Sequence, residues 1–117
     1  GSIAEEFYKL TNLVVFHIGG IPLTGTLSTK IGELTKLERL VLFDNSFHGP
    51  IPSTIGKTNL AFLGLTSNMF TGTIPSEMGH LTRMDTLYLG YNGLDGSIPE
   101  SFSDLQVLKT LNVNDNM

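Results

Sequence analysis

The chain has 117 residues, enough for one domain with a hydrophobic core of its own. Eleven acidic residues against seven basic ones give a net charge of −4, which argues against nucleic-acid binding, because phosphate contacts need clustered Lys and Arg. The absence of cysteine excludes disulfides and cysteine-based metal sites. No apolar run approaches the ~20 residues that cross a bilayer, so we expect no membrane insertion by these residues.

The opening segment, GSIAEEFYKL, agrees with GSIPESFSDL at 96–105 in six of ten positions. Glycines at 25, 49, 72 and 96 keep one phase, and counting back one period from Gly25 reaches Gly1. We therefore interpret residues 1–12 as the second half of a repeat, with Ala4 where Pro usually stands and Tyr8 where Gly usually stands. Neither end shows the polar cap that closes repeat arrays, so we expect a window cut from a longer array.

The first half of the repeat has the pattern L-x-x-L-x-L-x-x-N. It occurs as LERLVLFDN, LAFLGLTSN, MDTLYLGYN and LKTLNVNDN, and as LVVFHIGGI with Ile21 in place of the final Asn. The pattern predicts one repeated domain over 1–117, with full repeats at 13–36, 37–59, 60–83 and 84–107 and a partial repeat at 108–117.

Alternation of apolar and variable residues predicts a short strand in each repeat, and equivalent strands can pair in parallel. The residues expected to point inward are Leu40, Leu42, Leu63, Leu65, Leu87, Leu89, Leu111 and Val113. A column of asparagines is expected to bind backbone groups of its own loop and of the adjacent repeat, because an amide both donates and accepts. Its members are Asn45, Asn68, Asn92 and Asn116.

Glycine followed by Ile-Pro, at 51–52, 74–75 and 98–99, predicts a short second strand or extended segment and then a 3₁₀ turn. Leu34, Leu81 and Leu105 are expected to fill the back of the core. The repeat 37–59 is one residue shorter and lacks this leucine, which predicts a dent on the outer side.

These segments resemble the plant-type leucine-rich repeat over the whole chain. The resemblance implies an α/β solenoid, a right-handed superhelix with a parallel concave β-sheet and short 3₁₀ turns on the convex side. Such repeats are typical of the extracellular parts of receptor-like kinases and receptor-like proteins, and of secreted inhibitors of microbial cell-wall enzymes. The resemblance therefore implies a non-catalytic recognition module at the cell surface or outside the cell, the alternative location being cytoplasmic.

The variable strand positions should face the concave side, where aromatic and aliphatic residues of adjacent repeats would form one exposed patch. Tyr and Arg are enriched among the energetic anchors of interfaces. We predict that this face binds a protein, peptide or glycan. The alternative is that the aromatics are scattered and contact no partner. The candidate ligand-binding residues are Val15, Arg39, Val41, Phe43, Asp44, Phe62, Thr86, Tyr88 and Tyr91.

Other chemistry finds little support in the sequence. His17, His48 and His80 lie at different phases of the repeat and should not converge, and no spacing suggests a nucleophile paired with a base. We therefore predict no enzyme, metal or cofactor within this chain. An ice-binding row through Thr26 and Thr73 is a further alternative, which Pro50 and Ser97 interrupt. A second possibility is a structural spacer, which would hold a binding region or a kinase elsewhere in a longer chain at a fixed distance. In either case the neighbouring repeats of the longer chain are expected partners.

Overall fold

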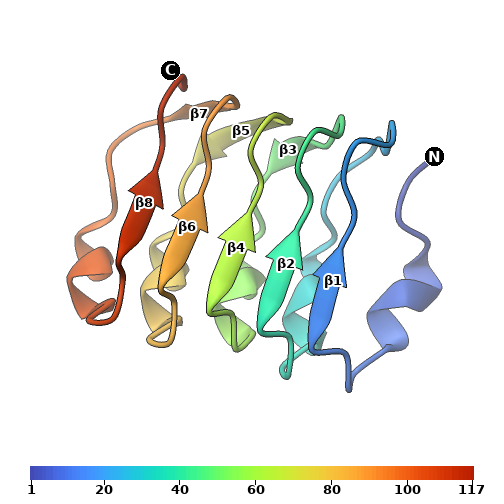
Figure 1. Cartoon of the computed structure of the whole chain (residues 1–117), viewed down its shortest axis with the longest axis horizontal. Coiled ribbons are helices and arrows are strands. Elements are labelled where there is room, and N and C mark those ends of the chain that lie inside the picture. Colours follow the sequence, from blue (N-terminus) through green and yellow to red (C-terminus); the bar gives the residue numbers. More distant parts are fainter.

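The computed structural model describes all residues 1–117. A parallel sheet of five three-residue strands, sheet A, runs along one side of the molecule (Figure 1). Each strand pairs in register with the equivalent strand of the next coil, as Arg39 does with Phe62 and Phe62 with Thr86. The strands, in spatial order, are β1 (Val15–His17), β2 (Arg39–Val41), β4 (Phe62–Gly64), β6 (Thr86–Tyr88) and β8 (Thr110–Asn112).

A second parallel sheet, sheet B, contains β3 (His48–Pro50), β5 (Met69–Thr73) and β7 (Gly93–Asp95). These strands lie before the Ile-Pro pairs rather than on them: β3 and β5 end directly before the pair, and β7 ends two residues earlier. Proline has no N–H to donate to a neighbouring strand, so the Ile-Pro pairs stay outside the sheet. No strand of sheet B forms between β1 and β2 and none follows β8, so this sheet has three strands where sheet A has five.

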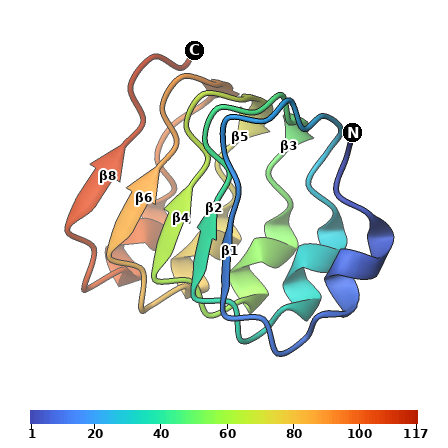
Figure 2. The same cartoon turned by 45° about the vertical axis from the view of Figure 1, so that its right-hand side comes forward.

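Five 3₁₀ turns cover the side opposite sheet A (Figure 2), as the sequence predicted. A proline in extended conformation precedes three of them, and Ala4 and Ser28 take its place before the first two. The turns are η1 (Glu5–Lys9), η2 (Thr29–Glu33), η3 (Ser53–Lys57), η4 (Ser76–His80) and η5 (Glu100–Asp104).

One continuous hydrophobic core lies between the sheets and the turns, so the leucines of neighbouring coils share one interior. The leucines predicted to point inward from β2, β4 and β6 are fully buried, and Leu34, Leu81 and Leu105 fill the back of the core. Leu111 differs, with 38% of its surface exposed, because it lies on the outermost strand, β8. Each fully buried leucine contributes about 1.5–3 kcal/mol to the stability of the stack.

The predicted dent in the short repeat does not open as a cavity. Thr58 takes the place of the missing leucine and is half-buried, and its hydroxyl donates to the Ile55 carbonyl at 2.8 Å. The backbone at Thr58 is extended, whereas the residues that follow the other turns have ψ between 64° and 72°. The shorter chain therefore closes by a change of backbone conformation.

The asparagine column forms a continuous ladder of hydrogen bonds. Each side-chain amide donates to carbonyls of its own turn and of the preceding coil, and each amide oxygen accepts an N–H from the preceding coil. Asn68 is the most buried: it donates to Leu42 at 2.7 Å and Leu65 at 3.1 Å, and accepts from Phe47 at 3.1 Å. Asn45, Asn92 and Asn116 repeat this arrangement.

Ile21, which occupies the asparagine column in the coil of β1, is 43% exposed and forms no such bonds through its side chain. The loop around it is held by the next coil instead. Asn45 accepts the N–H of Leu23 at 3.2 Å and donates to the carbonyl of Ile18 at 3.3 Å, while Gly20 donates to the carbonyl of Phe43. Hydrogen bonds of the ladder therefore reach this loop from the following coil only.

Candidate ligand-binding surface

Four of the predicted residues form a connected cluster on the outer face of sheet A. The guanidinium carbon of Arg39 lies 3.9 Å from the centre of the Phe62 ring, which is a cation–π contact. Phe62 meets Tyr88 edge to face, with ring centres 5.6 Å apart, and Tyr88 lies 6.2 Å from Phe43. We call Arg39, Phe43, Phe62 and Tyr88 the aromatic cluster. It spans three coils, and Phe43 and Tyr88 lie on the same side of the molecule.

Gly64 makes this cluster possible. It lies on the strand between those of Val41 and Tyr88, in register with both. A side-chain carbon built on Gly64 would lie 2.5 Å from the Phe43 ring, so this ring occupies the space of the missing side chain. Phe43 thereby reaches across the central coil to Tyr88. The sequence signal for this was a glycine within a strand, which often marks a close approach.

The prediction that Val41 is exposed was wrong. This residue was expected in the exposed patch, yet only 1% of its surface is accessible. We attribute its burial to the Phe43 ring, which covers the neighbouring Gly64. Val41 therefore supports the cluster from beneath and presents no surface to a ligand.

The remaining predicted residues surround the cluster without joining it. Val15 is 51% exposed on β1, beside Arg39 in the register, and Thr86 is half-buried beside Phe62. Asp44 and Tyr91 lie in the turns after the strands and have positive φ angles of 55° and 53°. Tyr91, at 60% exposure, makes no ring contact with the cluster. These two residues belong to the rim of the surface.

The charged side chains of Arg39 in the cluster and Asp44 at its rim have no oppositely charged partner. Arg39 is exposed and forms no ion pair, and neither does Asp44. The nearby Asp85 carboxylate accepts a hydrogen bond from the Thr86 hydroxyl at 2.7 Å. The surface therefore combines partly exposed aromatic rings with a guanidinium whose N–H donors remain free for a ligand.

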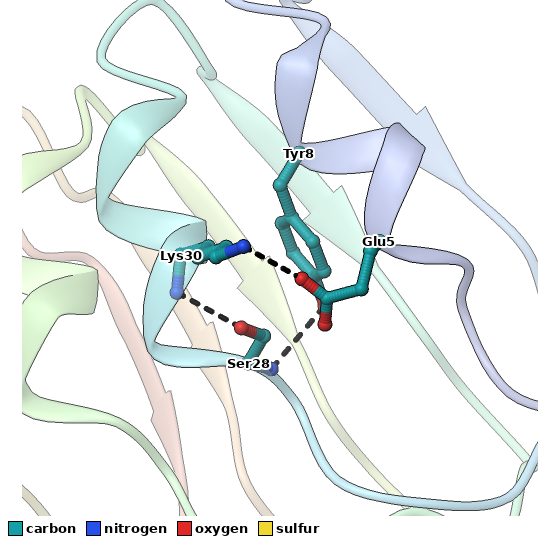
Figure 3. A network of polar contacts seen from close by, with 4 residues as sticks. All are labelled: Glu5, Tyr8, Ser28 and Lys30. Carbon is teal, nitrogen blue, oxygen red and sulfur yellow. Dashed lines mark hydrogen bonds and ion pairs between the residues drawn. The ribbon is translucent and has the colours of Figure 1, made fainter.

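A second polar arrangement, which sequence reasoning missed, lies on the opposite side between η1 and η2 (Figure 3). The Tyr8 hydroxyl accepts the N–H of Ser28 at 3.2 Å, and Lys30 forms the single ion pair of the structure with Glu5 at 2.8 Å. Burial raises the pKa of Tyr8, the Ser28 hydrogen bond lowers it less, and the Glu5 charge raises it further. The hydrogen bond with Glu5 likewise raises the pKa of Lys30.

The predicted separation of the histidines is confirmed, because His17 lies on sheet A, His48 on sheet B and His80 at the end of η4. No group of three or more His, Asp or Glu side chains is placed to hold a metal ion. None of the helical turns is long and apolar enough to span a membrane. Thr26 and Thr73 both point away from the core, but Pro50 lies on the coil between them.

A family profile described as Leucine Rich Repeat matches residues 36–58, 59–81 and 83–105. These segments cover more than half of the 117 residues, so the chain belongs to the leucine-rich repeat family. Its architecture is the leucine-rich-repeat solenoid that the sequence predicted.

The similar proteins include plant receptor kinases. A 45-residue segment, 38% of this chain and 4% of the relative, is 42% identical to the LRR receptor-like serine/threonine-protein kinase EFR of Arabidopsis thaliana. The ectodomain of the Arabidopsis thaliana membrane receptor kinase GASSHO1/SCHENGEN3, solved with CASPARIAN STRIP INTEGRITY FACTOR 2, matches with a TM-score of 0.96 and 33% identity. That match covers 98% of this chain and 14% of the receptor chain.

The Arabidopsis receptor kinase HAESA, solved with the peptide hormone IDA and the co-receptor SERK1, matches with a TM-score of 0.92 and 32% identity. The alignment covers 98% of this chain and 19% of the HAESA chain. The chain thus spans a small part of the length of each of these proteins. These plant receptor ectodomains and this chain share the leucine-rich-repeat solenoid.

Proposed function

We propose that this chain is a non-catalytic recognition segment of a receptor-like ectodomain, which binds a peptide or protein on the outer face of sheet A. The observation that carries the proposal is the aromatic cluster, a set of partly exposed rings and one unpaired guanidinium on a regular scaffold. Support comes from similar ectodomains that were solved with a peptide hormone.

The proposal places the protein at the cell surface or outside the cell, as part of a longer receptor. A cytoplasmic location is the alternative. Tyr and Arg are the residue types that most often dominate binding energies, and the cluster holds both in contact with phenylalanine rings. Glycan binding on this face stays a prediction without specific support, and so does inhibition of a microbial cell-wall enzyme.

The test uses peptides enriched on the wild-type chain from a displayed library of random dodecamers. Their affinities are measured by calorimetry for the wild type, for Phe43→Ala/Tyr88→Ala, and for Thr110→Ala, an exposed control on β8 outside the cluster. A cluster that anchors the ligand should lose about 2 kcal/mol or more, roughly 30-fold in affinity, while the control keeps wild-type affinity. Equal binding by all three proteins would remove the cluster from the proposal.

A spacer function is the second candidate, and the polar end of sheet A favours it. Thr110 and Asn112 on β8 are exposed and offer no aromatic anchor. If peptides bind only longer chains that carry other repeats, this segment would hold those repeats at a fixed distance.

A further inference from the structure

Two departures from the repeat pattern meet at one boundary between coils. Tyr8 stands in η1 where η2, η3 and η4 have glycine, and Ser28 precedes η2 where three other turns have proline. The two residues contact each other, because the Ser28 N–H donates to the Tyr8 hydroxyl at 3.2 Å. A proline at 28 could not donate this bond, so the departures form a matched pair.

The later boundaries are closed by glycine. Side-chain carbons built on Gly32, Gly56 and Gly79 would each collide with the next coil, at Thr54, Glu77 and Ser101 respectively. Tyr8 at the same place in the repeat keeps η1 away from η2, and these two turns have the loosest packing between successive turns. The boundary between η1 and η2 is therefore the most loosely packed of the four.

A groove of about 580 Å³ lies beside this boundary, over the extended segments that lead into η1, η2 and η3. Its volume is within the ~300–1,000 Å³ range of small-ligand sites. Its apolar lining consists of the exposed Pro50 and the partly exposed Ile3, with Leu27 and Pro52 buried beneath them. Most of its polar residues carry hydroxyl groups, and Glu5 adds one carboxylate. The hydroxyl residues are Ser2, Tyr8, Thr26, Ser28 and Thr29.

The Tyr8 hydroxyl is the most confined of these groups. Only 3% of the residue is exposed, and its oxygen accepts one hydrogen bond, from Ser28. Tyr8 lines the groove, so its hydroxyl can also donate to an acceptor atom of a molecule bound there.

The groove offers no net charge to a ligand. Glu5 lines it, but the Lys30 ammonium lies 2.8 Å from the Glu5 carboxylate and offsets its charge. An anion would meet the carboxylate and a cation would meet the ammonium. Hydroxyl groups that both donate and accept are matched best by ligand hydroxyls, which also do both.

We propose that this groove binds a neutral saccharide, with a sugar oxygen accepting from the Tyr8 hydroxyl and an apolar sugar face against the exposed Pro50. The site lies on the side opposite the aromatic cluster and does not depend on the function proposed for that cluster. A proline-rich peptide is the competing occupant, and it is included in the test below.

The experiment titrates the full chain with cellohexaose, maltohexaose, xylohexaose, the anionic hexamer of galacturonic acid, and hexaproline, followed by ¹H–¹⁵N NMR. At least one neutral hexasaccharide should shift the amides of residues 25–29. Thr26→Val and Tyr8→Phe should each weaken that binding about 3- to 10-fold, the effect of one net hydrogen bond. The matched control is Thr73→Val, the same position two coils later and outside the groove, which should bind like the wild type.

Four results would overturn the proposal: no neutral hexasaccharide shifts these amides, the galacturonic acid hexamer or hexaproline binds more tightly, the shifts fall on sheet A, or Thr73→Val weakens binding as much as Thr26→Val. Because Tyr8→Phe also removes the acceptor of the Ser28 N–H, its fold is checked by the amide spectrum before titration. Thr26 is exposed, so Thr26→Val keeps the test independent of folding.

Discussion

The boundary between η1 and η2 and the boundary between η3 and η4 come from the same repeat, yet they close in different ways. Gly56 lets η3 lie directly against the backbone of η4, so this boundary is tight and has no groove. At the corresponding place Tyr8 carries a ring and a hydroxyl, and the Ser28 N–H donates a hydrogen bond to that hydroxyl. The comparison teaches that a repeat position can change its residue when the neighbouring coil changes too.

Replacing Tyr8 should have the largest effect on stability and tests this comparison directly. Although Tyr8→Gly restores the usual residue of the repeat, it removes a buried ring that packs edge to face on Phe7. We expect a loss of about 3–5 kcal/mol, the range for deleting a buried aromatic side chain. Urea unfolding followed by circular dichroism measures it. A loss below about 1 kcal/mol would show that η1 can close on η2 as the later turns do.

The asparagine ladder allows a second comparison, between the stability lost when Asn68 is replaced and the stability lost when Asn45 is replaced. Asn68→Ala should cost about 2–3 kcal/mol, because it leaves the buried Phe47 N–H without a partner. It also removes one hydrogen bond each from the Leu42 and Leu65 carbonyls, which still accept from Asn45 and Asn92. Asn45→Ala should cost less, about 1–2 kcal/mol, because Asn45 is more exposed and its bonds are 3.1–3.3 Å long. Unfolding midpoints of the two variants measure the difference, and the reverse order would contradict a ladder anchored at its centre.

A methyl group at the tight boundary gives a smaller effect. Gly56→Ala should cost about 1–3 kcal/mol, because the added carbon meets the Glu77 carbonyl, a backbone group that cannot rotate away. Gly1→Ala is the control, since nothing lies near a side chain there. Thermal unfolding compares the two variants, and equal midpoints would mean that η3 and η4 can separate without cost.

The smallest expected effect is a pH dependence of the folding stability that comes from the boundary between η1 and η2. The pKa of Tyr8 is raised in the folded protein, so its contribution to stability is complete below about pH 10 and is lost as the pH rises through the folded pKa. Tyr8→Phe should remove the part of the stability loss at high pH that comes from ionisation of the Tyr8 hydroxyl. Lys30, whose pKa is also raised, loses its contribution in the same direction, so Lys30→Gln serves as the comparison. Unfolding between pH 8 and 11 measures both; a Tyr8→Phe curve parallel to the wild type would contradict the assignment.

Residues whose role repeats along the chain were predictable from the sequence. The buried leucines, the asparagine ladder and the 3₁₀ turns each recur once per repeat, so their positions follow from the period alone. Four aromatic-cluster residues were also placed on the correct face. Val41 was predicted wrongly because its burial depends on a glycine and a phenylalanine of different coils.

The Tyr8–Ser28 pair was not predicted for a related reason. Both departures were visible in the sequence, but the two residues occupy different columns of the repeat and lie 20 positions apart. Only the three-dimensional stacking shows that one donates to the other. The loop around Ile21 likewise required the structure, because its hydrogen bonds come from the asparagine of the following coil.

The measurement that bears most directly on the proposed recognition function is a map of amide shifts when a library-selected peptide is added to the ¹⁵N-labelled chain. The account predicts that the largest shifts fall on β2, β4 and β6 beside the aromatic cluster, and that Phe43→Ala/Tyr88→Ala abolishes them. Shifts confined to the 3₁₀ turns, or unchanged by that double substitution, would contradict it.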